Sequence, residues 1–177
     1  TYPSGRIVRN YLDQDSGLSV VTSKASNGLN KIVASNFDYT AAGGIKKMKL
    51  GNGLWETSQV NERFQLTQVG LGTTATNNNL FKIDYEYGEI SSDHSSVDVG
   101  KNVGMIARTT TTIPTTSFVQ TYKYDAIARL TEAKEKTGST TNWQQTFGYD
   151  TFGNRTSFSQ SINGLSIPNS NVNHPTI

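Results

Sequence analysis

Two stretches in the second half of the chain share one pattern, and that pattern decides the fold. They read Tyr122-Lys123-Tyr124-Asp125-Ala126-Ile127-Ala128-Arg129-Leu130-Thr131 and Phe147-Gly148-Tyr149-Asp150-Thr151-Phe152-Gly153-Asn154-Arg155-Thr156. In each, two aromatic residues stand two positions apart, Asp follows, and a small residue comes four positions after the second aromatic. A small residue at this offset indicates a turn, since glycine adopts positive φ without a Cβ clash. Each stretch therefore predicts a β-hairpin whose Asp side chain accepts N–H bonds of the turn.

The same aromatic pattern occurs in two earlier places, as Phe37-Asp38-Tyr39 and as Tyr85-Glu86-Tyr87. Gly43 stands four positions after Tyr39, at the offset of the small residues above. All four copies extend backwards with a period of two residues, as Val33, Ser35, Phe37 and Tyr39; Phe81, Ile83, Tyr85 and Tyr87; Phe118, Gln120, Tyr122 and Tyr124; and Trp143, Gln145, Phe147 and Tyr149. A period of two places side chains on one side of a strand, whereas a helix would scatter them. Each copy therefore predicts a strand with one buried aromatic face.

Turn signals mark the other ends of the expected hairpins. Asn-Gly pairs, the strongest short hairpin signal, occur at residues 27–28, 52–53 and 163–164. Residues 60–66 have the form of a degenerate further copy of the repeat. Between the turn signals lie about eleven strand-like runs, and the sequence shows no convincing helix of about ten or more residues.

These patterns predict an all-β fold. We expect antiparallel hairpins repeated along a twisted or spiralling sheet, as a single array of about six units over residues 1–177 with no separate catalytic domain. The polar segments 72–79 and 91–101 interrupt the pattern and are expected to be loops.

The composition agrees with a repetitive β chain and excludes several classes of protein. Thr, Ser and Asn make up 57 of the 177 residues, which argues against a helical bundle. The sequence contains no run of eighteen apolar residues, so it predicts no transmembrane helix, and without cysteine it has no disulfide or zinc-thiolate site. A net charge of +2 is too small to indicate nucleic acid, and we interpret Lys46, Lys47 and Lys49 as a solvated strand face. Because the sequence begins at Thr1 without Met, we expect a fragment or a processed chain.

The repeated stretches resemble the Tyr-Asp repeat of the RHS/YD-repeat protein family. That motif is Tyr-Asp, two variable residues, Gly, and then Arg-Leu or Asn-Arg. Residues 124–131 and 149–156 match it, with Ala128 in place of one Gly. Tyr2-Pro3-Ser4-Gly5-Arg6 resembles another form that is frequent in bacterial members, and residues 39–45 match with the Asp and the Arg lost. The resemblance covers nearly the whole chain.

The resemblance implies a ribbon of hairpins that winds into a spiral and, in large members, closes a hollow shell. Bacterial RHS toxins, insecticidal toxin complexes and teneurins share that design, and in many bacterial members the shell encloses a C-terminal toxin. The chain is then expected to be a structural segment of a large secreted or cell-surface bacterial protein, whose wall encloses or presents a C-terminal toxin or effector. The residues expected to build the repeats are Tyr39, Gly43, Tyr85, Tyr87, Tyr122, Tyr124, Asp125, Arg129, Phe147, Tyr149, Asp150, Gly153 and Arg155.

A repeat hairpin buries its apolar side only against its neighbours, so the terminal strands keep open edges. We therefore expect the partners of this chain to be neighbouring repeats of a longer parent chain, or further copies that pair edge to edge. A strictly monomeric, fully folded species at high concentration in light scattering would contradict self-association.

Neither histidine forms a convincing catalytic set. His94 lies in Ser92-Asp93-His94-Ser95-Ser96, but adjacent residues of an extended chain point apart, and a triad needs converging side chains. His174 lies near the end of the chain. The Asp-Pro motif of the family's core domain, which houses self-cleaving carboxylates in members that have it, does not occur. We therefore expect no enzyme activity and no cofactor.

Two weaker motifs have structural explanations. Asp13-Gln14-Asp15-Ser16-Gly17 contains the first half of a calcium loop, but the distal ligands are missing, so we expect a turn stabilised by Asp side chains and no metal. Gly51-Asn52-Gly53 precedes no helix and is typical of a hairpin turn, not of a phosphate loop.

Carbohydrate binding at a cell surface is the alternative function, and family members at cell surfaces have been linked to it. Trp55 and Trp143 are the candidate sugar-stacking residues, because aromatic faces stack on the C–H face of sugars. The repeat tyrosines are better explained by packing on the sheet, whereas Trp55 lies outside that pattern. Trp fluorescence that does not change with sugars would contradict this alternative.

Overall fold

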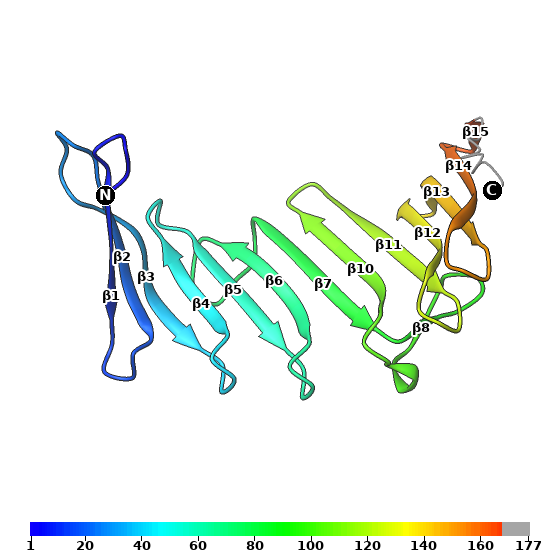
Figure 1. Ribbon diagram of the computed structural model, residues 1–177, viewed down its shortest axis with the longest axis horizontal. Coiled ribbons are helices and arrows are strands. Elements are labelled where there is room, and N and C mark those ends of the chain that lie inside the picture. The colour runs from blue at the N-terminus through cyan, green and yellow to red at the C-terminus, as the bar shows by residue number, and fades with distance from the viewer. Residues whose placement is uncertain (168–177) are drawn as a thin grey trace. The chain divides into compact units, whose positions relative to one another are not determined.

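The computed structural model describes residues 1–167, so His174 lies outside the described residues (Figure 1). The described residues form β-strands and one three-residue 3-10 helix, without an α-helix among them. The prediction of an all-β, repetitive antiparallel fold is therefore confirmed. Among the described residues, none lies in a helix that is long and apolar enough to cross a membrane. The chain divides into two compact units, residues 1–83 and the remainder from Asp84 onward.

The first unit is a sheet of strands that follow one another in chain order, each antiparallel to the next. Its strands are β1 (Ile7–Leu12), β2 (Leu18–Lys24), β3 (Lys31–Tyr39), β4 (Ile45–Leu50), β5 (Trp55–Val60) and β6 (Leu66–Gly72). A further strand, β7 (Phe81–Tyr87), spans the boundary between the units. Each strand is connected to the next by a short turn or loop, as a chain of hairpins requires.

The second unit repeats this arrangement and adds a small separate hairpin. Its main strands are β10 (Ile106–Ile113), β11 (Thr116–Tyr124), β12 (Leu130–Thr137), β13 (Thr140–Tyr149), β14 (Arg155–Ile162) and β15 (Leu165–Ile167). They also pair antiparallel in chain order. The separate hairpin consists of β8 (Glu89–Ile90) and β9 (Val97–Asp98), and the 3-10 helix η1 (Val99–Lys101) follows it.

The prediction of two loops is confirmed for the first apart from its first residue and is wrong in part for the second. In the predicted loop 72–79, Gly72 is the last residue of β6 and residues 73–79 contain no strand, as expected. Residues 91–101, however, include β9 and η1. The error arises because β8 and β9 are two residues long and pair only with each other, so they carry no alternating pattern that a sequence could show.

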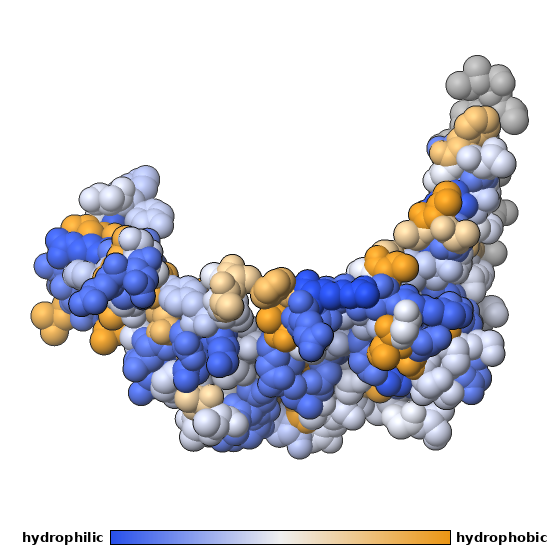
Figure 2. All heavy atoms as spheres, turned by 90° about the horizontal axis from the view of Figure 1, so that it is seen from below, coloured by the Kyte–Doolittle hydropathy of each residue, from blue (hydrophilic) through white to orange (hydrophobic). Residues whose placement is uncertain are grey.

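The core of the chain is thin and is made of small side chains. The buried hydrophobic residues among those described are Ala34, Ile90, Ala107 and Ala133, and no large side chain is fully buried. The repeat aromatics are only half-buried, whereas the sequence predicted a buried aromatic face. The prediction therefore overstated their burial. The physical reason is that no helix or full second sheet within residues 1–167 covers the strands, and rings on an uncovered sheet face keep part of their area in water. Figure 2 accordingly shows hydrophobic residues at the surface among hydrophilic ones.

A bulge breaks the predicted alternation in β3. Asn36 has a φ of 54°, and the pairing register with β4 shifts between Ser35 and Asp38. An extra residue in one strand changes which side the preceding residues face. Ala34 is therefore the buried residue of β3, while Val33 is 46% exposed. The prediction that Val33 and Ser35 continue the face of Phe37 and Tyr39 is not supported by this register.

The Asn-Gly pairs form turns of different kinds. Asn163 and Gly164 have φ values of 48° and 78°, which is the two-residue turn with positive φ at both positions, and they connect β14 to β15. Gly53 lies in the turn between β4 and β5 with a φ of 89°. Residues 27–28 differ, because they lie in a longer loop between β2 and β3.

Candidate functional site

The turn that follows each matching repeat has one backbone geometry. At residues 125–129, the Asp125 N–H donates to the Arg129 carbonyl at 2.9 Å, and the Ala128 N–H donates to the Asp125 carbonyl at 3.0 Å. Residues 150–154 repeat both bonds at 3.0 and 3.2 Å. The same pair of bonds closes residues 2–6, 13–17, 40–44, 50–54 and 61–65. This is the three-residue hairpin loop in which a type I turn is followed by a residue with positive φ.

The fourth residue of these turns has positive φ whether or not it is glycine. Gly43 and Gly153 have φ values of 79° and 88°, and a Cβ added at either would meet nothing within 4 Å. Ala128 has a φ of 64°, Ser16 of 64° and Phe64 of 58°. Ala128 therefore adopts the conformation of the glycine it replaces in the motif. A left-handed conformation costs a residue with a Cβ roughly 1–2 kcal/mol, so the surrounding bonds must offset that strain.

The aspartate of the turn provides some of these bonds. The Asp125 carboxylate accepts from the N–H groups of Ile127 at 3.1 Å and Arg129 at 2.9 Å, and from Arg129 Nε at 2.6 Å. The backbone N–H of Arg129 is the largest cause that lowers the pKa of Asp125 below its ordinary value. The carboxylate is therefore stabilised in its charged form by the turn that it closes.

Asp150 plays the same part in the next hairpin. Its carboxylate accepts from the N–H groups of Phe152 at 2.9 Å and Asn154 at 2.8 Å, and from Asn154 Nδ2 at 2.9 Å. The side-chain bond from Asn154 is the largest cause that lowers the pKa of Asp150. Asp13 accepts from the N–H groups of Asp15 and Gly17 at 3.0 and 2.7 Å. The Asp13 segment is thus the expected turn, and no cluster of metal-ligating residues occurs in the described part of the chain.

In three hairpins, the tyrosine directly before the turn is bonded to the preceding strand. Three tyrosines at strand ends donate their hydroxyl to the carbonyl of the first residue of the preceding strand, as Tyr39 to Leu18 at 2.7 Å, Tyr124 to Ile106 at 3.0 Å and Tyr149 to Leu130 at 2.8 Å. We call this contact the tyrosine clamp. It joins the end of one strand to the start of the antiparallel strand before it, at the same tyrosine where the pairing with the following strand shifts its register.

Arg129 connects two consecutive turns. Its Nε donates to Asp125 Oδ2 at 2.6 Å, its Nη1 donates to the Asp150 carbonyl at 3.1 Å, and its guanidinium lies 4.7 Å from the centre of the Tyr149 ring. The planar guanidinium can make all three contacts at once because it has donors on several edges and a face that stacks on aromatic rings. Arg155 lies elsewhere, with its guanidinium 5.5 Å from the centre of the Phe158 ring.

The remaining repeat residues pack along the strands. Tyr122 donates its hydroxyl to Gln120 Oε1 at 2.7 Å, and the Phe147 ring contacts Phe158 at 5.5 Å between centres. Tyr85 and Tyr87 are half-buried on β7, and burial, with Tyr85 adding to it, raises the pKa of Tyr87.

The two tryptophans do not form an exposed platform. Both are half-buried. The Lys49 ammonium lies 5.9 Å from the centre of the Trp55 ring, and Trp143 pairs across β13 with Glu135 and Ile162. The structure therefore offers no observation that favours sugar stacking at Trp55 or Trp143. Of the lysine cluster, Lys46 and Lys47 are each within 4.0 Å of the Asp38 carboxylate.

The structure brings together a buried cluster that sequence reasoning missed. The His94 side chain is 5% exposed, with Nδ1 2.7 Å from Thr121 Oγ1 and Nε2 3.0 Å from Glu132 Oε1. Asp93 instead accepts from the hydroxyls of Ser91 and Ser95, so the adjacent Asp-His pair of the sequence does not act together. A hydroxyl, an imidazole and a carboxylate in a row resemble a triad, but Thr121 is 4% exposed and cannot meet a substrate.

Glu132 is the centre of this cluster. Its Oε1 also accepts from Gln144 Nε2 at 2.8 Å, and its Oε2 accepts from Lys123 Nζ at 2.9 Å. The pKa of Glu132 is lowered although burial acts to raise it, because the bonds from Lys123 and His94 outweigh burial. No sequence pattern could have shown this cluster, since Thr121 and Glu132 lie 27 and 38 residues from His94.

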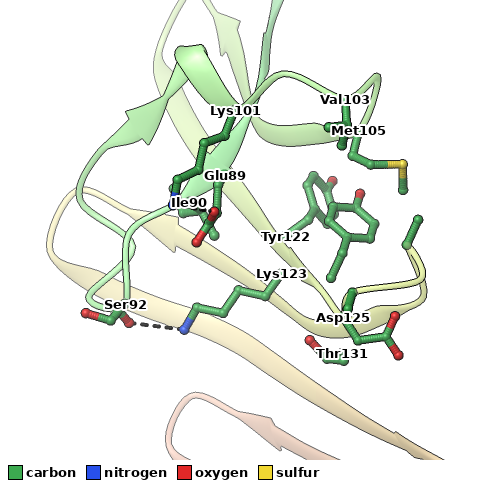
Figure 3. Close-up of a pocket in the computed structure, with 14 residues that line it drawn as sticks. Glu89, Ile90, Ser92, Lys101, Val103, Met105, Tyr122, Lys123, Asp125 and Thr131 are labelled. Carbon is green, nitrogen blue, oxygen red and sulfur yellow. Dashed lines mark hydrogen bonds and ion pairs between the residues drawn. The ribbon is translucent and has the colours of Figure 1, made fainter.

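The cluster holds an insertion in the repeat, residues 88–105, between β7 and β10. Tyr39, Tyr124 and Tyr149 are each followed directly by one of these hairpin turns, whereas Tyr87 is followed by β8, β9 and η1. A groove of about 810 Å³ is lined by residues of this insertion and of the sheet. Figure 3 shows the side chains that line it. Met105 and Val103 of the insertion and Tyr122 of β11 line it. The lysines at its rim are paired, Lys101 with Glu89 at 2.7 Å and Lys123 with Glu132.

Comparisons with known proteins identify the fold but not a family. No protein-family model and no curated protein matches the sequence. The chain is similar to solved structures of TcdB2-TccC3-TEV (16% identity, TM-score 0.68, 91% of this chain), TcdB2-TccC3 without hypervariable C-terminal region (17%, 0.71, 90%) and TcdB2-TccC3-Cdc42 (18%, 0.73, 94%). It spans 8% of the length of each of these chains. At this identity the likeness concerns the fold alone, and the chain has an RHS-like fold.

Proposed function

We propose that the chain is a structural segment of a larger RHS-type protein of the YD-repeat family. In this proposal it forms one repeat array in the wall of a β-sheet shell that encloses or presents a C-terminal toxin or effector. The parent protein is secreted or lies at the surface of a bacterium. The segment contributes no catalysis and needs no cofactor.

The observation that carries the proposal is the way consecutive hairpins are fastened together. The tyrosine clamps at Tyr39, Tyr124 and Tyr149 fasten three hairpins to the strand before them, and Arg129 links two consecutive turns. Stability in such an array comes from contacts between neighbouring repeats, because a single hairpin has little to bury. A chain built this way extends by adding repeats, which is what a wall requires.

The similar structures support a role within a much longer protein. The chain spans 8% of the matched chains, and one of these is described as lacking a hypervariable C-terminal region. We infer that the parent of this chain also carries a variable region after its repeats, which is the part that the shell would enclose.

Limited proteolysis of the full-length gene product tests the proposal. A tag at the far C-terminus should be protected from protease while the protein is folded and should be cleaved rapidly in urea. Equal cleavage rates with and without urea would contradict enclosure. The flanking sequence discriminates further, since a core domain and a variable domain downstream favour a shell, whereas adhesin-like anchors favour a carbohydrate-binding surface module.

A further inference from the structure

Two buried side chains attach the insertion 88–105 to the sheet, the hydrophobic Ile90 on β8 and the polar His94. His94 and Thr121 are the buried polar residues among those described, and they contact each other. His94 sits at the tip of the β8–β9 hairpin with a φ of 63°. Two further hydrogen bonds attach the insertion, from Lys123 Nζ to the Ser92 carbonyl at 3.1 Å and from Arg108 Nη1 to the Ser95 carbonyl at 3.3 Å.

The contacts of His94 are satisfied when the imidazole is neutral. The Nε2–H then donates to the Glu132 carboxylate, and Nδ1 accepts from the Thr121 hydroxyl. If Nδ1 were protonated, it would become a hydrogen-bond donor. The Thr121 hydroxyl would then have to accept from Nδ1–H, and its own hydrogen would have to point elsewhere. Within the described residues that hydroxyl has no other hydrogen-bond partner. Protonation therefore leaves a donor unpaired in a buried place, which is unfavourable.

The charges around His94 do not balance an added proton. The charged groups on the surrounding elements are Lys123 on β11, Glu132 and Lys134 on β12, Asp93 in the hairpin itself, and Arg108 on β10 with Glu86 on β7. Glu132 favours protonation, but it is already paired with Lys123. Asp93 is held by Ser91 and Ser95, and Arg108 by Glu86. Burial is the largest cause that lowers the pKa of His94, and Lys123 and Lys134 act in the same direction.

We propose that His94 is a proton-operated latch: the neutral imidazole holds the insertion 88–105 on β11 and β12, and protonation in mildly acidic solution releases it. Release opens the groove that the insertion bounds, and it exposes Met105 and Tyr122 (Figure 3). This device is independent of the proposed shell function, because it depends only on contacts within the second unit of the chain.

Hydrogen exchange of the 177-residue chain, followed by mass spectrometry at pH 7.5 and 5.5 and corrected for intrinsic rates, tests the latch. Residues 88–105 should exchange about fivefold faster at pH 5.5, the change that the loss of one ordinary hydrogen bond gives. His94→Gln should remove this pH dependence, since the amide can donate to Glu132 and accept from Thr121 without titrating. His174→Gln, at the only other histidine of the sequence, is the matched control and should keep it. Equal pH dependence in wild type and His94→Gln, or none in wild type, would overturn the proposal.

If His94→Gln does not fold, NMR titration of the histidines in the wild-type chain tests the latch instead. The latch requires the neutral Nε2–H tautomer at pH 7.5 and a titration midpoint below the ordinary 6.5. In Glu132→Gln the midpoint should fall further, because the carboxylate that favours the proton is gone. A midpoint above 6.5 in the wild type would show that Glu132 dominates, and protonation would then tighten the insertion instead of releasing it.

Discussion

Tyr149→Phe isolates the energy of one tyrosine clamp. The change removes only the hydroxyl that donates to the Leu130 carbonyl at 2.8 Å. The ring remains, so the guanidinium of Arg129 keeps its contact with the ring face at 4.7 Å. An ordinary hydrogen bond contributes about 1 kcal/mol net to stability, and the range is about 0.5–1.5 kcal/mol. We therefore expect Tyr149→Phe to lower the free energy of unfolding of the second unit by about 1 kcal/mol.

Urea denaturation followed by Trp143 fluorescence measures this loss. Trp143 lies on the same strand as Tyr149, and a Trp55→Phe background removes the fluorescence of the first unit. The urea midpoint should fall while the slope with urea stays unchanged. Tyr85→Phe is the matched control, because its hydroxyl has no hydrogen-bond partner among the described residues, and it should change stability by less than about 0.5 kcal/mol. A loss at Tyr149 no larger than the loss at Tyr85 would refute the clamp.

Three further predictions concern the turns. Residues 128 and 153 both have positive φ, which favours glycine. In the same urea assay, Ala128→Gly should therefore raise the free energy of unfolding by about 1 kcal/mol, and Gly153→Ala should lower it by a similar amount. A loss of stability in Ala128→Gly would contradict this explanation. Arg129→Lys should lower the free energy of unfolding by about 0.5–1 kcal/mol, because an ammonium cannot stack on the Tyr149 ring and also bond to both Asp125 and Asp150. An unchanged urea midpoint would contradict the role of Arg129 in connecting the two turns. The pKa values of Asp125 and Asp150 are lowered, so these carboxylates stabilise the fold above the ordinary pKa of 3.8, and this stabilisation is lost as pH falls below 3.8. The variant with both Asp125→Asn and Asp150→Asn should therefore lose less stability than the wild type in an acid titration. An acid transition identical to that of the wild type would contradict this role of the two aspartates.

Local features of the fold could be predicted from the sequence because they depend on residues close together in the chain. The turns at 125–129 and 150–154 are set by an Asp and a residue with positive φ within five positions, so their sequence signal is direct. The strands before them show a period of two because their two sides differ. The fold class follows from the recurrence of these two signals.

Contacts between distant residues could not be predicted in the same way. Tyr149 and Leu130 are 19 residues apart, and only the pairing of β12 with β13 brings them together. In the three clamps, the tyrosine and the residue that accepts its bond are 18 to 21 residues apart. This regular separation is a pattern that a search for repeats in the sequence could detect. The latch at His94 gives no such signal, because the insertion occurs once in the described chain and its partners are set by packing alone.

Electron cryomicroscopy of the full-length gene product tests the central claim most directly. The account predicts that residues 1–167 form part of a continuous β wall, with β1 paired at its free edge to a strand of a preceding repeat. A map in which these residues form an isolated domain, with the outer edge of β1 open to solvent, would contradict it.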